Sequence, residues 1–259
     1  MKKQKAILIE CTMTLIVILM LAGCKKDVVT QYVYRYLNDT IYLQARDSDS
    51  ISIPRSGLLA YFPFNGNAND ESGHGLNGLV HGAYLTSDRF EKANSAYMFN
   101  GDSSYIDLGF PDSLKFATGS KFTISAWIYT NSNRLTQSIV SFGNHSYHLY
   151  LQMYDSCYLQ WAAAQVVNTG VSYFEPVIES HKWYHIVAIN YVGEYVKLYI
   201  NADMKSFIFF PFIYNYEKNF TIGYTNSEGF FFNGKIDDIL IYKRELTENE
   251  IKQLYNLKI

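Results

Sequence analysis

The amino-acid sequence predicts an all-β protein in which two antiparallel sheets pack as a sandwich, with one short helix at the C-terminal end. The 259 residues include 23 Tyr and 17 Phe, and aromatic side chains favour half-buried sheet surfaces. About a dozen short segments rich in β-branched and aromatic residues are separated by Gly, Asn and Asp, which is typical of strands joined by turns. A helical period of apolar residues is nearly absent before the end of the chain. A chain of this length can therefore bury one large β-sandwich core.

Residues 122–130 give the clearest strand, because apolar and other side chains alternate along them with the period of two that a strand requires. The other expected strands cover residues 58–64, 96–100, 105–108, 138–142, 147–154, 158–162, 183–190, 195–201, 220–224 and 236–242. The expected helix follows Thr247, which forms a T-x-x-E capping box with Glu250. Its apolar face comprises Ile251, Leu254 and Tyr255.

Residues 1–24 are organised like a bacterial lipoprotein signal peptide. Lysines at the start precede an apolar run, 12–21, that is too short for a comfortable membrane span. The sequence Leu-Ala-Gly-Cys at 21–24 resembles a lipobox, in which the cysteine is lipidated and becomes the first mature residue. We therefore expect a lipid anchor at Cys24 and a location in the cell envelope, on the outer membrane. The alternative is an uncleaved membrane anchor.

Residues 25–55 are polar and β-branched, with no evident core of their own. The composition favours a tether that holds the following domain away from the membrane. Short stretches of both helical spacing and alternation also allow a self-associating stalk, through which the protein would form oligomers.

Five segments resemble one known family. They are 57–108, FTISAWIY at 122–129, WYHIVAINY at 183–191, VKLYIN at 196–201 and GKIDDILIYKRELTENEI at 234–251. Their order and spacing are similar to the concanavalin A-like lectin/glucanase superfamily, and within it to the laminin G-like domains of secreted and lipid-anchored bacterial proteins. The resemblance implies a jelly roll over residues 56–259. Two features depart from the family pattern: Ala202 follows the VKLYIN strand where the family usually has Gly, and segment 207–216 is unusually aromatic.

The same resemblance implies a structural Ca²⁺ site. In the family, an Asp of the first loop and an Asp of the last strand can meet at one end of the sandwich, which here means Asp70 with Asp237 or Asp238. Calcium prefers six to eight oxygen ligands, carboxylates among them. The alternative is that these residues hydrogen-bond to neighbouring backbone and hold turns.

Catalysis is not expected. Glycoside hydrolysis needs two carboxylates across the sugar bond, about 5 Å apart in retaining enzymes. The sequence contains no E-x-D-x-x-E run, and successive strand residues point to opposite faces, so Asp237 and Asp238 are not expected to act together. A divergent glycoside hydrolase would require acids from separate strands to converge.

Aromatic residues on the central strands are the expected ligand-binding surface. Tyr147, Tyr150, Tyr154 and Trp161 lie where some side chains must face outward. Outward rings stack on pyranose rings in sugar-binding modules, although they can equally fill a second packed face or contact a protein.

The remaining aromatic residues are expected to pack. Trp127 and Trp183 match core positions of the family, so both are expected in the interior. The segment 207–216 is expected to form an added hairpin packed on the sandwich, with an exposed contact patch as the alternative.

Together these features predict a non-catalytic cell-envelope lipoprotein that binds carbohydrate. The alternative is a module for protein adhesion or structure, whose partner would be a cell-surface protein and whose stalk at 25–55 would oligomerise. The net charge of −2 argues against nucleic-acid binding, which requires a basic surface.

Overall fold

The computed structural model describes most of the chain. The described residues are 31–37, 40–46, 52–132, 136–143, 146–153, 157–163, 171–172, 178–209, 211, 214, 216–225 and 229–258. The chain divides into two units, Met1–Ile53 and Pro54–Ile259. The second unit begins close to the predicted domain start at residue 56.

The first unit contains a β-hairpin. Strand β1 (Gln31–Leu37) pairs antiparallel with β2 (Thr40–Arg46), and Leu37 lies opposite Thr40. The segment 25–55 therefore includes paired strands rather than only a tether, which agrees with its content of Val, Ile and Tyr. The predicted oligomer through this segment stays a prediction.

The predicted signal peptide and the lipidated Cys24 lie outside the described residues. In the part of the chain that the structure describes, no helix combines the length and apolar character that a membrane span requires.

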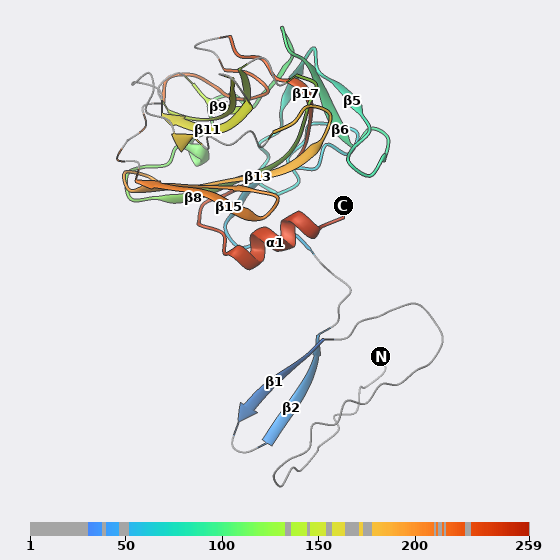
Figure 1. The fold of residues 1–259 in the computed structure, drawn as a ribbon, viewed down its shortest axis with the longest axis vertical. Helices are drawn as coiled ribbons and strands as arrows, with labels where there is room; N and C mark the ends of the chain where they lie inside the picture. The colour runs from blue at the N-terminus through green and yellow to red at the C-terminus, as the bar shows by residue number, and fades with distance from the viewer. Residues whose placement is uncertain are drawn as a thin grey trace. The chain divides into compact units, whose positions relative to one another are not determined.

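The second unit is a sandwich of two antiparallel sheets (Figure 1). The seven-stranded sheet has the order β12 (Val171–Ser172), β11 (Cys157–Ala163), β10 (Tyr147–Met153), β9 (Gln137–Phe142), β16 (Phe220–Ile222), β7 (Tyr105–Asp107) and β4 (Leu79–His81). The eight-stranded sheet has the order β15 (Asp203–Phe209), β14 (Tyr195–Ile200), β13 (Trp183–Tyr191), β8 (Lys121–Thr130), β17 (Asn233–Tyr242), β6 (Ala96–Asn100) and β5 (Tyr84–Thr86), and β3 (Leu58–Phe62) also pairs with β17. The predicted all-β jelly-roll sandwich is confirmed.

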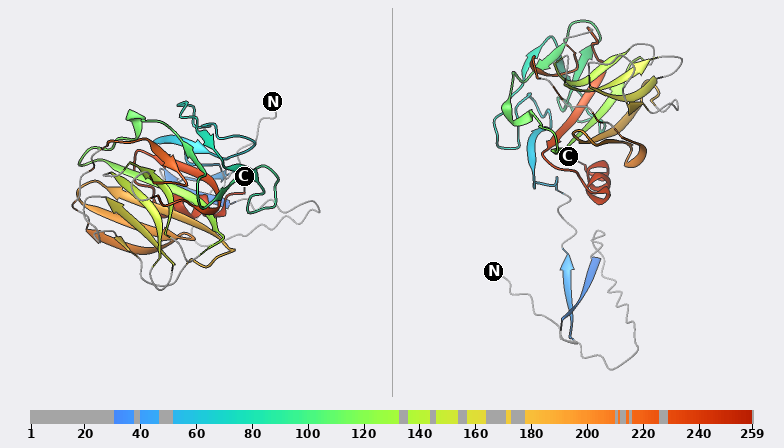
Figure 2. Two further views of the ribbon diagram at one scale, coloured as in Figure 1. Left: turned by 90° about the horizontal axis from the view of Figure 1, so that it is seen from above. Right: turned by 90° about the vertical axis from the view of Figure 1, so that its left-hand side faces the viewer.

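The core lies between the two sheets. Alternate residues of β8, from Phe122 to Ile128, and of β10, from Tyr147 to Leu151, point inward and are fully buried. Aromatic rings from both sheets meet there: the Phe116 and Phe122 rings stack with centroids 4.0 Å apart. Each large apolar side chain buried in this way stabilises the fold by about 1.5–3 kcal/mol. The two layers and the twist of their strands are visible from two further directions in Figure 2.

Strand β17 contains a bulge next to Asp237. It pairs with β6 over its first half and with β3 over its second, and its register against β8 shifts between Asp237 and Leu240. Asp238 sits in the shift with a left-handed backbone, φ 45°. A bulge adds an unpaired residue and breaks the alternation of faces. The expectation that Asp237 and Asp238 point to opposite faces is therefore wrong.

The predicted C-terminal helix is confirmed as α1 (Glu248–Asn256). Thr247 accepts a hydrogen bond from the Glu250 backbone, and the Glu250 side chain accepts one from the Thr247 backbone, which completes the capping box. Ile251 and Leu254 are buried beneath it. Figure 1 shows α1 against the eight-stranded sheet, on the side away from β9 and β11. The helix thus covers part of that sheet's outer face.

The aromatic segment 207–216 is divided between surface and interior. Phe207 and Phe209 are 57% and 67% exposed on the edge strand β15, whereas Tyr214 and Tyr216 pack against the core. The prediction that the whole segment packs on the sandwich is wrong for its first half. Strand β15 ends the sheet, and the Phe207 ring contacts only its neighbours Tyr195 and Lys197 among the described residues.

The turn before β15 explains how the chain does without the family's usual glycine. Asn201 and Ala202 both adopt left-handed backbones, with φ 52° and 66°. A turn of this kind suits the twist of a tight hairpin, although Gly and Asn fit it better than Ala. The Asn201 side chain accepts a hydrogen bond from the His185 backbone at 3.0 Å, which holds the turn in place.

Candidate functional site

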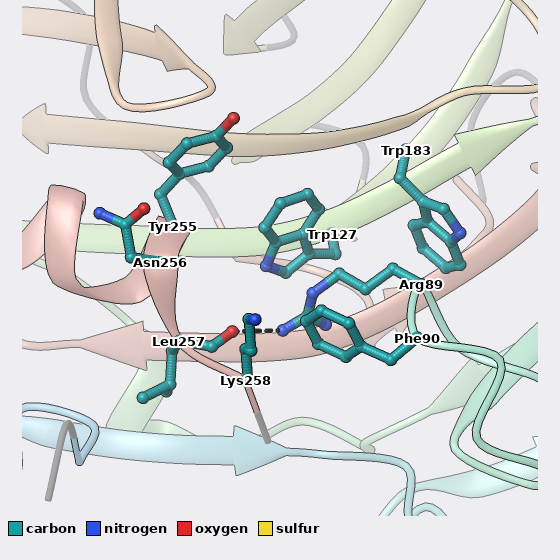
Figure 3. Close-up of a pocket in the computed structure, with 8 residues that line it drawn as sticks. All are labelled: Arg89, Phe90, Trp127, Trp183, Tyr255, Asn256, Leu257 and Lys258. Carbon is teal, nitrogen blue, oxygen red and sulfur yellow. Dashed lines mark hydrogen bonds between the residues drawn. The ribbon is translucent and has the colours of Figure 1, made fainter. Parts of the chain in front are cut away.

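A pocket of about 370 Å³ opens on the outer face of the eight-stranded sheet, beside the C-terminal end of α1 (Figure 3). It is lined by Arg89, Phe90, Trp127, Trp183, Tyr255, Asn256, Leu257 and Lys258. Half of these side chains are aromatic, and they come from four parts of the chain that only folding brings together. A concave, mostly apolar site with a few polar groups is what small ligands require, and its volume lies within their usual range.

The sheet places two tryptophans on the pocket wall. Trp127 lies on β8 between two inward residues, Ala126 and Ile128, so alternation turns its indole outward. It is 9% exposed, and its ring stacks on Tyr255 of α1 with centroids 5.7 Å apart. Trp183 begins β13 on the neighbouring strand and is partly exposed. The prediction that both tryptophans lie in the interior is wrong for Trp183, which is partly exposed, whereas Trp127 is buried on the outer face of the sheet and not between the sheets.

An ion-paired arginine forms the polar floor beneath the aromatic rings. Arg89 Nη1 donates to Asp238 Oδ2 at 2.6 Å and to Asp237 Oδ2 at 3.0 Å. Its Nη2 donates to the Leu257 carbonyl at 3.1 Å, which ties the chain after α1 to the sheet. The Arg89 side chain is 5% exposed, and those of Asp237 and Asp238 are 3% and 5% exposed. The bulge in β17 makes this arrangement possible, because it brings both carboxylates to one guanidinium.

The guanidinium of Arg89 is also enclosed by aromatic rings. Its central carbon lies 4.5 Å from the Trp127 ring centroid and 4.6 Å from that of Phe90 (Figure 3). Cation–π contacts of this kind stabilise an arginine most when water is excluded from them. Arg89 is therefore fixed from both sides and at its end.

Burial changes the protonation of the acidic pair. Burial raises the pKa of Asp237 well above the ordinary value, and repulsion from Asp238 raises it further, while Arg89 opposes both effects. Burial also raises the pKa of Asp238, again against the pull of Arg89. The pair therefore keeps a proton more readily than exposed aspartates do.

Several polar groups on the pocket lining are left to bind a ligand, among them the Trp127 indole N–H, the Asn256 side-chain oxygen and the buried Arg89 Nε. The Trp127 indole N–H makes no hydrogen bond within the described residues, and Figure 3 shows this nitrogen on the side of the ring toward Leu257. The Asn256 amide donates to the Lys252 carbonyl at 2.8 Å, and its side-chain oxygen has no donor among the described residues. The Trp127 donor and the Asn256 acceptor thus lie beside the aromatic walls.

The residues predicted to bind ligand lie elsewhere. Tyr147 and Trp161 are fully buried between the sheets, with parallel rings whose centroids are 5.8 Å apart. Tyr150 is 8% exposed and stacks on His148, and Tyr154 lies outside the described residues. The prediction of a binding surface on Tyr147 and Trp161 is corrected, because a fully buried ring cannot present its face to a sugar.

The predicted calcium ligands do not fit a shared site. Asp70 accepts backbone hydrogen bonds from Tyr61 at 2.9 Å, Ser72 at 2.8 Å and Leu76 at 3.1 Å, so its carboxylate organises its own loop. These contacts hold the pKa of Asp70 below the ordinary value despite partial burial, which opposes them.

The other two predicted calcium ligands are taken by a cation of the protein itself, since Asp237 and Asp238 both pair with Arg89. No group of three or more His, Cys, Asp or Glu residues could hold a metal in the part of the chain described. The structure therefore favours the alternative reading of Asp70 as a turn residue.

Sequence reasoning missed the pocket for two reasons. The alternation of residues along β8 predicts that the Trp127 side chain points away from the core. The match of Trp127 to a core position of the family predicts the opposite, and it was given more weight. Arg89 gave no signal of its own, because it stands in a loop without a motif. Two buried acids need a cation beside them, and this need indicates an arginine. The burial of the two acids is known only from the fold.

A family model of the concanavalin A-like lectin/glucanases superfamily matches residues 100–252, more than half of the chain. No curated protein matches the sequence. Among solved structures, domain 4 of AbnA, a GH43 extracellular arabinanase from Geobacillus stearothermophilus in complex with arabinotriose, is similar with a TM-score of 0.62 and 22% identity. The match covers 78% of this chain and 99% of that chain.

Botulinum neurotoxin binding domains are similar over about half of their own length. The binding domain of neurotoxin DC in complex with rat synaptotagmin II has a TM-score of 0.59 and 18% identity, covering 79% of this chain and 52% of that one. A structure of type C, whose cell entry depends on two ganglioside molecules, has a TM-score of 0.56 and 18% identity, covering 77% and 51%. Identities this low show a shared fold.

Proposed function

Because the chain belongs to the concanavalin A-like lectin/glucanase superfamily, we propose that it is a non-catalytic module that binds glycans in the pocket beside α1. The observation that carries the proposal is the combination of aromatic walls with an unpartnered donor, the Trp127 indole N–H. This pocket replaces the predicted surface on Tyr147 and Trp161.

The chemistry of the pocket suits a sugar ring. A pyranose has an apolar face of C–H groups, which packs against aromatic rings, and a rim of hydroxyls, which needs donors and acceptors. Trp183 and Tyr255 offer partly exposed rings, and the Trp127 indole and the Asn256 amide oxygen offer the polar partners. A desolvated polar pair beside stacked rings gives orientation as well as affinity.

Similar structures support binding as the general role. The arabinanase domain was determined with arabinotriose, and the neurotoxin domains engage a protein receptor or gangliosides. Carbohydrate as the ligand of this chain is our proposal, based on its own pocket.

The state of the acidic pair supports a role without catalysis. Asp237 and Asp238 are close enough to share one nitrogen of Arg89, but both are almost fully buried beneath the pocket lining. A glycosidase needs both carboxylates at the sugar bond. Here the guanidinium occupies the position where substrate would have to be.

We further propose that the mature protein is anchored in the cell envelope, on the outer membrane, through a lipid on Cys24. The lipobox-like sequence at 21–24 motivates this proposal. Replacing Cys24 with Ser should move the protein from the membrane fraction to the soluble fraction, and unchanged fractionation would contradict the anchor.

Binding can be tested with a glycan array followed by calorimetric titration of the best oligosaccharide, with arabinotriose included as a probe. We expect saturable binding by the purified chain and at least a tenfold loss in Trp183→Ala. Tyr84→Ala is the matched control, since Tyr84 is 60% exposed on the edge strand β5 and does not line the pocket. Absence of binding to any glycan, or equal loss in both variants, would refute the proposal.

A second candidate function is protein adhesion through the edge strand β15. Met204, Phe207 and Phe209 are each more than half exposed there, at 51%, 57% and 67%. Exposed apolar residues on an edge strand favour contact with another chain. If this surface carries the function, the double variant Phe207→Ser/Phe209→Ser should abolish partner capture while Trp183→Ala leaves it unchanged.

A further inference from the structure

The charge of the arginine beneath the pocket is already paired within the protein. Arg89 is the cation nearest to the aromatic walls, and its charge is already paired with two carboxylates, although its Nε is buried without a hydrogen-bond partner among the described residues. Nη1 donates hydrogen bonds to two carboxylates, and Nη2 donates one to the Leu257 carbonyl. The rings of Phe90 and Trp127 contact the guanidinium. An anionic ligand group would therefore have to compete with two carboxylates of the protein for the charge of this arginine.

The acids behind the pocket floor outnumber the buried cation. Asp237 and Asp238 are joined by Asp88, which is 1% exposed and acts electrostatically on both. Asp88 Oδ1 accepts hydrogen bonds from the Phe90 and Lys92 backbones at 2.8 and 2.9 Å, so its place in the loop is fixed. Three buried carboxyl groups thus act on one another beside a single buried guanidinium, in a region that water screens little.

We propose that the pocket selects neutral saccharides and rejects acidic sugars of the same skeleton, a selectivity that rests on the proposed glycan-binding function. A carboxylate entering the pocket would lose its hydration, meet aromatic walls, and gain no unpaired buried cation in return. Lys258 stands at the mouth, but it is exposed, so water and salt screen its charge.

A neutral sugar meets none of these penalties. Its hydroxyl oxygen can accept from the Trp127 indole, and a hydroxyl hydrogen can be donated to the Asn256 side-chain oxygen. Its ring carries no charge to desolvate, so the stacking energy of the aromatic walls is kept. The expected ligand class is therefore neutral hexose or pentose oligosaccharides, without uronic or sialic acid at the bound residue.

The test uses pairs of oligosaccharides that differ only in the carboxylate. Each pair consists of a uronic acid trimer and the neutral trimer of the same linkage, stereochemistry and length. Examples are the trimers of galacturonic acid and galactose, and those of glucuronic acid and glucose. Titration of the full chain should give at least tenfold tighter binding for the neutral member of any pair that binds.

A variant tests the physical cause of the selectivity. Asp88→Asn keeps the oxygen that accepts the backbone hydrogen bonds of the loop and removes one buried negative charge. The ratio of the affinities for the neutral and the acidic oligosaccharide should therefore narrow at least threefold. Asp102→Asn is the matched control, because Asp102 is exposed in the turn after β6 and does not line the pocket. The control should leave the ratio unchanged.

Two outcomes would overturn the inference and can be told apart. If the acidic member binds as tightly as the neutral one, selectivity is refuted while glycan binding stands. If no oligosaccharide of either class binds, the proposed function fails and the selectivity fails with it. An unchanged ratio in Asp88→Asn would refute the electrostatic cause.

Discussion

The three tryptophans divide between the two faces of the sandwich, and that division separates stability from binding. Trp161 of β11 points inward and is fully buried against Tyr147. Trp127 and Trp183 of the other sheet point outward and line the pocket. The inner face is closed mainly by apolar packing, with the Trp161 indole donating to the Tyr214 hydroxyl, whereas the outer face combines aromatic rings with a buried ion-paired arginine. The same residue type therefore serves the core in one sheet and the proposed site in the other.

The largest expected effect comes from breaking the inner face. Trp161→Ala removes a fully buried ring and should lower the free energy of unfolding by about 3–5 kcal/mol, because the cavity cannot collapse completely. Trp183→Ala should cost less than about 1 kcal/mol, since its ring is partly exposed. Denaturant unfolding of both variants measures the difference, and equal losses would contradict the division of the faces.

Removing the arginine of the outer face should cost nearly as much. Arg89→Met leaves the buried acidic pair without its cation, so we expect a loss of about 3 kcal/mol in the free energy of unfolding at pH 8. Arg55→Met is the control, because Arg55 makes a single long contact to the Glu71 carbonyl at 3.5 Å. A loss in Arg89→Met no larger than in the control would show that the ion pair contributes little.

The pH dependence of stability sharpens the contrast between the faces. The raised pKa of Asp237 means that the folded protein binds more protons than the unfolded chain above the ordinary aspartate pKa. The free energy of unfolding should therefore fall as pH rises from 7 to 9, by up to about 1.4 kcal/mol per pH unit.

The buried histidines do not interfere in this range. Burial lowers the pKa of His148 and His185 to about 3, so their effect is a loss of stability as pH falls below 6.5. In Asp237→Asn the decline between pH 7 and 9 should flatten. If the free energy of unfolding declines with the same slope in this variant, the decline is caused by other groups.

The smallest expected effect concerns metal. Because Arg89 neutralises Asp237 and Asp238, and Asp70 is satisfied by its own loop, a chelator should shift the melting temperature by less than about 1 °C. Thermal melts with EDTA and with added Ca²⁺ measure this. A shift of several degrees would restore calcium as a ligand of this domain.

Much of the fold could be predicted from the sequence. Alternation along 122–130, turn residues between short strands and the capping box at Thr247 identified the sandwich and its helix, since each depends on local chemistry. Strands of three residues or fewer, such as β4 and β12, carry too few residues for a period to show. The edge strand β15 was missed because its exposed apolar residues resemble those of a packed strand.

The candidate site could be predicted only in part. Whether an aromatic residue faces inward depends on which alternate residues of its strand point to the core, and the residue pattern of β10 and β11 does not distinguish the two possibilities. The approach of Asp237 and Asp238 to Arg89 depends on a bulge where β17 changes partners from β6 to β3. No local pattern marks such a change, because it is set by the lengths of other strands.

The most direct test is a two-dimensional ¹H–¹⁵N NMR titration of the three tryptophan indole groups, assigned by single Trp→Phe variants. On addition of a neutral oligosaccharide that binds, we predict that the indole signals of Trp127 and Trp183 shift with saturation while that of Trp161 stays in place. Shifts of Trp161 with the other two unchanged would contradict the assignment of binding to the outer face.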